Sequence, residues 1–380
     1  MTAIDLSHPD RRVRLAGLAE VTPLERGGLT ERLPAWARAQ LMDPAIAFVS
    51  SMPSGGRLEF VTDSTSIEME VVLTRLQWGG VVPHSAMFDL VIDGELVDSA
   101  AVEETDLISF PDRASIEFEI VHADPSVIRF QGLRRGSKHV EVWLPQNASA
   151  ILRELRLEGG ASVAAPPASA RRRWVHYGSS ISHCMEADHP TGVWPAVTAR
   201  HADVDLASLG LAGQCQLDQF AARTIRDLDA DLISLKLGIN LVNVDTMRER
   251  AFVPAVHGFL DTIRDGHRHE PIVVISPIIC PVAEDHPGPT LPNADGRFDV
   301  VKRPDELLIG ALTLVRIREL LELIVVQRQD PSLHYLHGHE LFGADDVDDL
   351  PDGLHPNSAG YQRMGERFLT HAFGIDGPFA

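Results

Sequence analysis

Cysteine is scarce in this sequence of 380 residues. Only Cys184, Cys215 and Cys280 are present, an odd number that contains no Cys-x-x-Cys pair. The chain therefore has no disulfide framework, and a reducing compartment is the simpler inference. No residue in the sequence pairs Cys184 with a base of its own, so we expect a buried structural thiol there.

Basic residues are also few, with 34 Lys and Arg against 54 Asp and Glu and a formal net charge of -20. Such a balance disfavours nucleic acid or an anionic membrane as the main partner. The chain has neither a long apolar run nor a basic start followed by an apolar core, so we expect no membrane association and a cytoplasmic protein. Gly210-Leu211-Ala212-Gly213 lacks the third glycine of a dinucleotide fingerprint, and no phosphate loop is present, so we expect no bound cofactor.

The N-terminal part of the chain is rich in short alternating segments. Apolar and polar residues alternate with a period of two, which is typical of strands with one buried face. The segments span residues 57–61, 67–73, 88–95, 115–120, 139–144 and 151–157, and Asp93-Gly94 is a good hairpin turn. The length suits two domains. We predict that residues 1–158 form a β-sandwich of the jelly-roll type.

Residues 159–170 contain small residues and a Pro pair without periodicity, which predicts an interdomain linker. The run Arg171-Arg172-Arg173 follows. Three cations in a row could contact a phosphate, but a solvated strand start is the preferred interpretation.

Strand-like and helix-like segments alternate from residue 171 to 380. Predicted strands cover 204–209, 232–237, 272–275 and 334–337, and predicted helices cover 195–201, 214–228, 248–265, 304–327 and 358–373. This order predicts a parallel sheet with helices on both faces, in which ligands bind at the carboxyl ends of the strands. The stretch 277–303, rich in Pro and Gly, is too long for a plain connection and predicts a lid or substrate loop.

A possible nucleophile follows the strand-like run that begins at Trp174. Apolar and aromatic residues lead directly into Gly178-Ser179-Ser180, which predicts a buried strand ending in a tight turn that presents a hydroxyl. A serine hydroxyl needs a base, a group that orients the base, and donors for the oxyanion.

The distal part of the chain offers these groups. Asp352 precedes His355 by three residues, so its carboxylate can bind one ring nitrogen and leave the other for the serine proton. Gly213 and Asn240 each follow a strand-like run, where their amides can join the Ser180 amide in an oxyanion hole. Three histidines and a following acidic run offer ligand types for a metal, but their spacing fits a strand and a solvated loop better, and we expect no metal.

These residues resemble the four ordered sequence blocks of the SGNH, or GDSL-like, hydrolase superfamily. The resemblance implies a three-layer, flavodoxin-like α/β domain over residues 171–380. It also implies that Ser180 is the nucleophile, His355 the base, Asp352 its partner, and Gly213 and Asn240 oxyanion donors. Ser179 and Leu241 stand where acidic residues are common in the family. His183 and Leu241 are candidates for the pocket, although His183 could equally be a packing residue.

The sandwich, the Gly-Ser-Ser variant of block one and the expected cytoplasmic setting together resemble a GDSL-like acyltransferase of aromatic polyketide biosynthesis. This resemblance implies transfer of an aryl acyl group, salicylyl in the first instance, from a coenzyme A thioester to a hydroxyl of a tetracycline-type acceptor. The charge of -20 opposes docking of a polyphosphate donor, so Arg171 to Arg173 or Lys302-Arg303 would have to bind it. Two alternatives stay open: an esterase acting on carbohydrate or small esters, and a non-catalytic glycan-binding protein. The sequence leaves the oligomeric state open.

Overall fold

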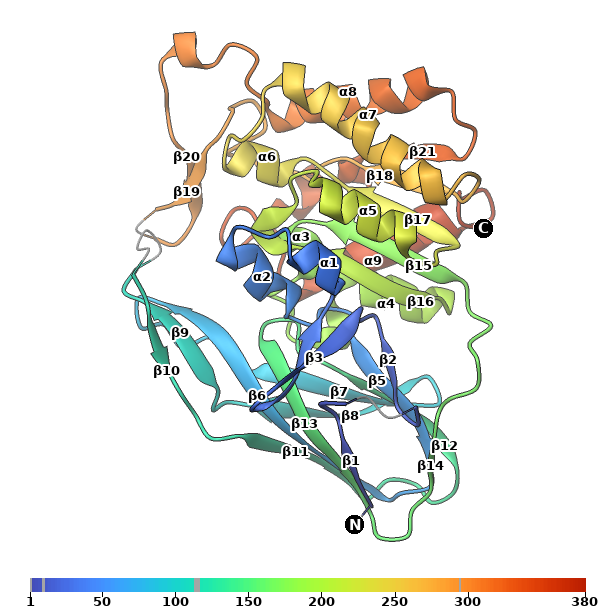
Figure 1. Cartoon of the computed structure of the whole chain (residues 1–380). Coiled ribbons are helices and arrows are strands. Elements are labelled where there is room, and N and C mark those ends of the chain that lie inside the picture. The colour runs from blue at the N-terminus through green and yellow to red at the C-terminus, as the bar shows by residue number, and fades with distance from the viewer. Residues whose placement is uncertain (1, 9–10, 113–116, 294) are drawn as a thin grey trace. The chain divides into compact units, whose positions relative to one another are not determined.

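The computed structural model describes residues 2–8, 11–112, 117–293 and 295–380. The chain forms two compact units (Figure 1). Unit 1 comprises Met1–Arg171 together with Ala187–Gly192, and unit 2 comprises Arg172–Glu186 together with Val193–Ala380.

Unit 1 contains two predominantly antiparallel β-sheets. The eight-stranded sheet has the order β10-β9-β6-β13-β4-β3, with β1 on β13 and β11 on β6, and the six-stranded sheet has the order β14-β5-β12-β7-β8, with β2 on β5. The strands of the first are β1 (Thr2–Asp5), β3 (Glu20–Leu24), β4 (Gly27–Glu31), β6 (Ser66–Trp78), β9 (Asp106–Phe110), β10 (Glu119–Val121), β11 (Ser126–Gln131) and β13 (Ser149–Leu157). Those of the second are β2 (Arg14–Ala16), β5 (Arg57–Thr62), β7 (Ala86–Ile92), β8 (Glu95–Val102), β12 (Lys138–Trp143) and β14 (Val163–Ala164), and the unit also has two short helices, α1 (Ala35–Arg38) and α2 (Pro44–Ser50).

Alternation along the strands explains the core of unit 1. Leu58 and Phe60 of β5 point into the apolar core, where alternate residues of β6 and β7 join them. Each large side chain so buried contributes about 1.5–3 kcal/mol. The predicted β-sandwich is confirmed.

The predicted hairpin is confirmed as well. Ile92 pairs with Glu95, so that Asp93 and Gly94 form a two-residue turn with φ of 52° and 90°. Both positive values fit a type I′ turn. The predicted strand 115–120 lies partly outside the described residues, and the structure has β10 beginning at Glu119.

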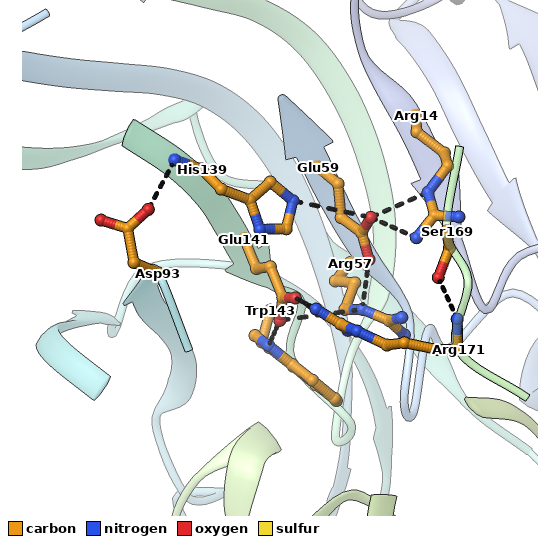
Figure 2. Close-up of polar contacts among 9 residues, drawn as sticks. All are labelled: Arg14, Arg57, Glu59, Asp93, His139, Glu141, Trp143, Ser169 and Arg171. Atoms are coloured by element: carbon orange, nitrogen blue, oxygen red, sulfur yellow. Dashed lines mark hydrogen bonds and ion pairs between the residues drawn. The ribbon is translucent and has the colours of Figure 1, made fainter. Parts of the chain in front are cut away.

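The outer face of β5 and β12 carries a buried charge cluster (Figure 2). Arg57 and Glu59 are each 1% exposed and pair at 2.8 Å, and Arg14 also donates to Glu59. Arg171 binds Glu141 of β12 at 3.3 Å. The pair with Glu141 holds Arg171, the last residue of this segment of unit 1, on the sheet, because a buried carboxylate without a cationic partner destabilises the fold.

Ala187–Gly192 returns to unit 1 although its flanking residues belong to unit 2. Asp89 of β7 is fully buried and accepts hydrogen bonds from Thr191 N, Thr191 Oγ1 and His189 Nδ1 at 3.1, 2.6 and 3.0 Å. Gln146 Nε2 donates to the Ala187 carbonyl at 2.5 Å. A single boundary between two consecutive segments, as predicted from the sequence, does not describe this return; the chain changes unit three times.

Unit 2 is built on a five-stranded parallel sheet in the order β16-β15-β17-β18-β21. The strands are β15 (Arg173–Gly178), β16 (Asp205–Gly210), β17 (Leu232–Lys236), β18 (Ile272–Ile275) and β21 (Leu333–Leu336). The helices are α3 (Ser180–His183), α4 (Trp194–Ala202), α5 (Gln219–Asp227), α6 (Ile239–Asn243), α7 (Glu249–Gly266), α8 (Leu314–Arg328) and α9 (Ser358–Phe373), and a short hairpin joins β19 (Thr290–Pro292) to β20 (Phe298–Val300). This is the flavodoxin-like strand order, in which the order reverses at the first strand. The predicted parallel α/β domain is confirmed.

Helices cover both faces of this sheet (Figure 1). Trp174 of β15 stacks on Phe368 of α9, whereas Tyr177 of the same strand stacks on Phe259 of α7. Residues 174 and 177 point to opposite faces because side chains alternate along a strand.

One predicted helix was wrong over its first half. The structure begins α8 at Leu314 rather than at residue 304, because the Thr313 side chain caps the helix by accepting from Arg316 N at 3.1 Å. A three-residue turn of 3-10 helix, Asp305–Leu307, occupies part of the segment predicted as helix. No helix in the described ranges combines the length and the apolarity that crossing a membrane requires.

Candidate active site

The carboxyl ends of β15, β16 and β17 bring the predicted site segments together. Gly178, at the end of β15, pairs with Gly210 at the end of β16. Both positions need glycine: a Cβ on Gly178 would lie 2.2 Å from Ser182 Oγ, and one on Gly210 would lie 2.5 Å from His183 N. The missing side chains let the short helix α3 pack directly on the sheet.

Ser180 is the first residue of α3. The Ser179 side chain caps this helix by accepting from Ile181 N at 3.3 Å, so Ser179 supplies a brace where the family commonly has an acidic residue. The hydroxyl of Ser182, two residues further along, forms a hydrogen bond of 2.8 Å with Nε2 of His176, and Nδ1 of the same ring bonds to Ser234 Oγ at 2.7 Å.

His176 is fully buried beneath this helix. Burial, followed by the charge of Lys236, lowers the pKa of His176 to about 3. The ring therefore stays neutral and acts as a bridge between two hydroxyl groups rather than as a cation.

His355 joins Ser180 and Asp352 in a continuous chain of hydrogen bonds. His355 Nε2 lies 2.9 Å from Ser180 Oγ, and His355 Nδ1 lies 2.7 Å from Asp352 Oδ2. The other oxygen of Asp352 accepts from the backbone amides of Leu354 and His355 at 2.9 and 2.7 Å. Burial favours the neutral acid, but the bonds from His355 and these amides hold the pKa of Asp352 below its usual value.

The loop that carries His355 is fixed from a second side. Gly353 has φ of 85°, which only glycine adopts without strain. Phe298 of β20 donates its amide to the Asp352 carbonyl at 2.8 Å and places its ring edge-on to His355, with centroids 5.7 Å apart. The hairpin thus packs against the imidazole and the loop that carries it.

Asn240 lies at the start of α6, directly after Gly238. Its Oδ1 accepts from Cys215 N at 3.0 Å, which leaves Nδ2, the donor, facing away from that amide. Gly213 is exposed in the turn before Cys215. A Cβ on Gly213 would meet nothing within 4 Å, so this turn is open to a ligand.

The two pocket candidates are buried. His183 is 0% exposed and donates from Nδ1 to the Gly210 carbonyl at 3.0 Å, and Leu241 is 1% exposed. Their contribution to a pocket stays a prediction.

All three cysteines are buried. Burial raises the pKa values of Cys215 and Cys280 to about 12 and that of Cys184 well above its ordinary value. The thiols stay protonated and are therefore poor nucleophiles. Within the described ranges, no three His, Cys, Asp or Glu side chains converge as a metal site.

The basic residues proposed for phosphate binding are mostly engaged elsewhere. Arg171 binds Glu141, Arg173 binds Asp231 at 3.3 Å, and Arg303 pairs with Asp245. Arg172 donates to the Ala380 carbonyl at 3.3 Å. Arg171 to Arg173 are therefore engaged in contacts that stabilise the fold.

A small cavity of about 140 Å³ lies beside the His355 loop. Its lining is partly apolar and partly polar, and it consists of Pro281, Val282, Asn293, Arg297, Phe298, Asp299, Val347, Leu350 and Gly353. Six of these residues, from Pro281 to Asp299, belong to the 277–303 stretch predicted as a lid or substrate loop. That stretch therefore borders the site.

Glu186 and Tyr361 also belong to the site, although the sequence did not mark them. Glu186 Oε1 lies 3.8 Å from His355 Nδ1, and Glu186 Oε2 accepts from the Tyr361 hydroxyl at 2.8 Å. A lone Glu six residues after the nucleophile has no pattern that distinguishes it from a surface residue.

The fold and these segments are those expected of a serine enzyme of acyl chemistry. Residues 171–280 match the GDSL-like lipase/acylhydrolase family. This match contains the blocks of Ser180, Gly213 and Asn240, so the resemblance to the GDSL-like family is confirmed there, and the comparisons support an enzyme of the GDSL type. A comparison with the sequences of curated proteins finds no match.

Among solved structures, the chain is similar to the salicylyl-acyltransferase SsfX3 from a tetracycline biosynthetic pathway. The two share 26% sequence identity with a TM-score of 0.81, over 100% of this chain and 99% of that chain. The fold is also shared with a family two carbohydrate esterase from Cellvibrio japonicus, at 13% identity and a TM-score of 0.61, over 97% of this chain and 96% of that one. An acetyl xylan esterase from Butyrivibrio proteoclasticus has 10% identity and a TM-score of 0.55, over the same 97% and 96%.

Proposed function

We propose that this protein is a serine acyltransferase that moves an aryl acyl group, salicylyl in the first instance, from a coenzyme A thioester to a hydroxyl of a polyketide-type acceptor. The observation that most directly supports this proposal is the chain of hydrogen bonds from Ser180 through His355 to Asp352. The choice of acyl group and acceptor is supported by the likeness to SsfX3 over the whole chain.

The reaction has two steps. His355 Nε2 takes the Ser180 proton while Oγ attacks the thioester carbonyl. The backbone amides of Ser180 and Gly213 and the side-chain amide of Asn240 stabilise the oxyanion. His355 then returns the proton to the departing thiolate, which leaves an acyl ester on Ser180. In the second step His355 deprotonates the acceptor hydroxyl, and the new ester leaves as Ser180 regains its proton.

Asp352 keeps the proton of His355 on Nδ1 during both steps. Its lowered pKa means that the carboxylate is charged at neutral pH. The charge stabilises the imidazolium that forms when Ser180 gives up its proton.

Binding of a polyphosphate donor needs cations that have no acidic partner. Arg297 and Lys302 are exposed and have no ion pair among the described residues, and Arg297 lines the cavity beside Gly353. We expect Arg297→Ala and Lys302→Ala to raise KM about three- to tenfold for the coenzyme A thioester. KM for a short thioester of the same acyl group, which lacks the nucleotide, should stay unchanged.

Intact-protein mass after brief incubation with salicylyl-coenzyme A tests the proposal. A gain of one acyl group that is retained in Cys184→Ala and lost in Ser180→Ala places the adduct on Ser180. Faster discharge by a polyphenolic acceptor than by water supports transfer. No adduct and no turnover of the thioester would contradict it.

The fold shared with carbohydrate esterases favours one second candidate, an esterase on acylated carbohydrate. It predicts release of acetate from acetylated sugars with water as the acceptor. A glycan-binding protein without catalysis would instead bind sugar equally well after Ser180→Ala and show no activity to lose.

A further inference from the structure

Glu186 brings a second carboxylate to the nitrogen of His355 that Asp352 already binds. Glu186 Oε1 lies 3.8 Å from His355 Nδ1, whereas Asp352 Oδ2 lies at 2.7 Å. A neutral imidazole that accepts a proton at Nε2 has one N–H, at Nδ1. That hydrogen points to Asp352, so Glu186 acts through its charge rather than through a second short hydrogen bond.

Tyr361 holds Glu186 in this place. Its hydroxyl donates to Glu186 Oε2 at 2.8 Å, and the Tyr361 side chain is fully buried. Burial raises the pKa of the Tyr361 hydroxyl well above its ordinary value, so the hydroxyl stays a donor at every pH at which the enzyme works. Only one oxygen of Glu186 is then left to face His355.

The two residues also connect the two halves of the site. Glu186 follows α3, which carries Ser180, whereas Tyr361 belongs to α9, which follows the His355 loop. The Tyr361–Glu186 bond therefore links the nucleophile segment to the segment that carries the base.

We propose that Glu186 is a positioning residue for acyl transfer: its carboxylate stabilises the imidazolium form of His355 and, with Asp352, holds the ring in line with Ser180. The inference rests on the proposed function, in which Ser180, His355 and Asp352 form a catalytic triad. The imidazolium is the form that gains from a nearby negative charge, and it exists only while the serine proton is on His355.

The pH dependence of the rate reports this charge. Besides Ser180, the titratable and charged groups around His355 and its loop are the carboxylates of Asp352 and Glu186, the Tyr361 hydroxyl, the thiols of Cys184 and Cys280, and the Arg297 guanidinium. A negative charge raises the pKa of an imidazole, so removing one lowers it. The acid limb of kcat/KM should therefore move to lower pH when Glu186 is neutralised.

The experiment measures pH profiles of kcat/KM for the full chain with an activated aryl ester. We expect Glu186→Gln to move the acid limb down by about 0.5 to 1 pH unit and to lower kcat about three- to tenfold. Glu186→Asp keeps the charge and should leave the limb in place. Glu366→Gln, which removes an equal charge on the exposed face of α9, should change neither quantity.

A second arm uses the Asp352→Asn background. If Glu186 and Asp352 both stabilise the His355 imidazolium, Glu186→Gln should lower kcat/KM by a larger factor in this background than in the wild type. An unmoved acid limb, together with equal costs in both backgrounds, would overturn the proposal while Ser180-dependent activity persists. Loss of the proposed function itself would look different, because the unaltered enzyme would then form no acyl adduct on Ser180.

Discussion

Gly210→Ala is expected to disable the enzyme without touching any residue of the triad. The added Cβ would lie 2.5 Å from His183 N and 2.7 Å from Ser182 C, both backbone atoms of α3. Ordinary contact begins near 3.4 Å. The helix must therefore move by about 1 Å, and Ser180 is its first residue. A misplacement of that size costs about 10²-fold in rate where the reacting groups are held in position.

Gly213→Ala is the matched control, three residues further along. Its Cβ would meet nothing within 4 Å, and the backbone amide is kept. We expect this variant to stay within about threefold of the unaltered kcat, because backbone donors survive the substitution.

The assay compares kcat, KM and melting temperature of both variants with an activated aryl ester. Gly210→Ala should lower kcat far more than it changes KM, and overpacking should lower stability by about 1–3 kcal/mol. A Gly210→Ala enzyme within threefold of normal kcat would refute the reasoning that the close approach of Gly210 to α3 positions Ser180.

Four further results are expected. Asn240→Ala should lower kcat about 10²- to 10³-fold with little change in melting temperature, measured by steady-state kinetics, because it removes one oxyanion donor. Glu59→Gln should destabilise unit 1 by about 3–5 kcal/mol in denaturant titration, because the buried Arg57 guanidinium loses the carboxylate that it binds at 2.8 Å. The pKa of His176 is lowered to about 3 in the folded chain, so the unfolded chain takes up this proton first as the pH falls below about 6.5. The free energy of unfolding should therefore fall by about 1.4 kcal/mol for each unit by which the pH is lowered, and His176→Gln should remove this contribution when unfolding is measured as a function of pH. Phe298→Ala should raise hydrolysis relative to transfer when both products are quantified, because loss of the ring that packs against His355 opens this side of the site to water.

The sequence predicted those features that depend on local pattern. Alternation along β5 and β6 predicted the sandwich, and runs of apolar residues ending in glycine predicted the strand ends that gather around Ser180. The spacing of Asp352 and His355 predicted a carboxylate within reach of the ring, and the observed distance between these side chains is 2.7 Å. Each of these features needs only a few neighbouring residues to be recognised.

Other features depend on contacts between distant segments, which no local pattern records. Glu186 meets Tyr361 across 175 residues of sequence, and Asp89 binds Thr191 across 102 residues. The early start predicted for α8 failed for a different, local reason. Residues 304–313 have helical composition, but Thr313 caps the chain at a later point than periodicity indicates.

The hairpin of β19 and β20 is where hydrolysis and transfer can be separated. The triad serves either reaction, because His355 can activate water or an alcohol equally well. What differs is access to the acyl ester. The His355 side chain is only 12% exposed. The Phe298 ring packs against it, and the Phe298 amide donates to the Asp352 carbonyl. The same hairpin lines the cavity and carries Arg297, whose guanidinium has no acidic partner among the described residues. One segment thus combines an aromatic ring against the base with an exposed cation, and we predict that this combination favours transfer to an acceptor over release to water.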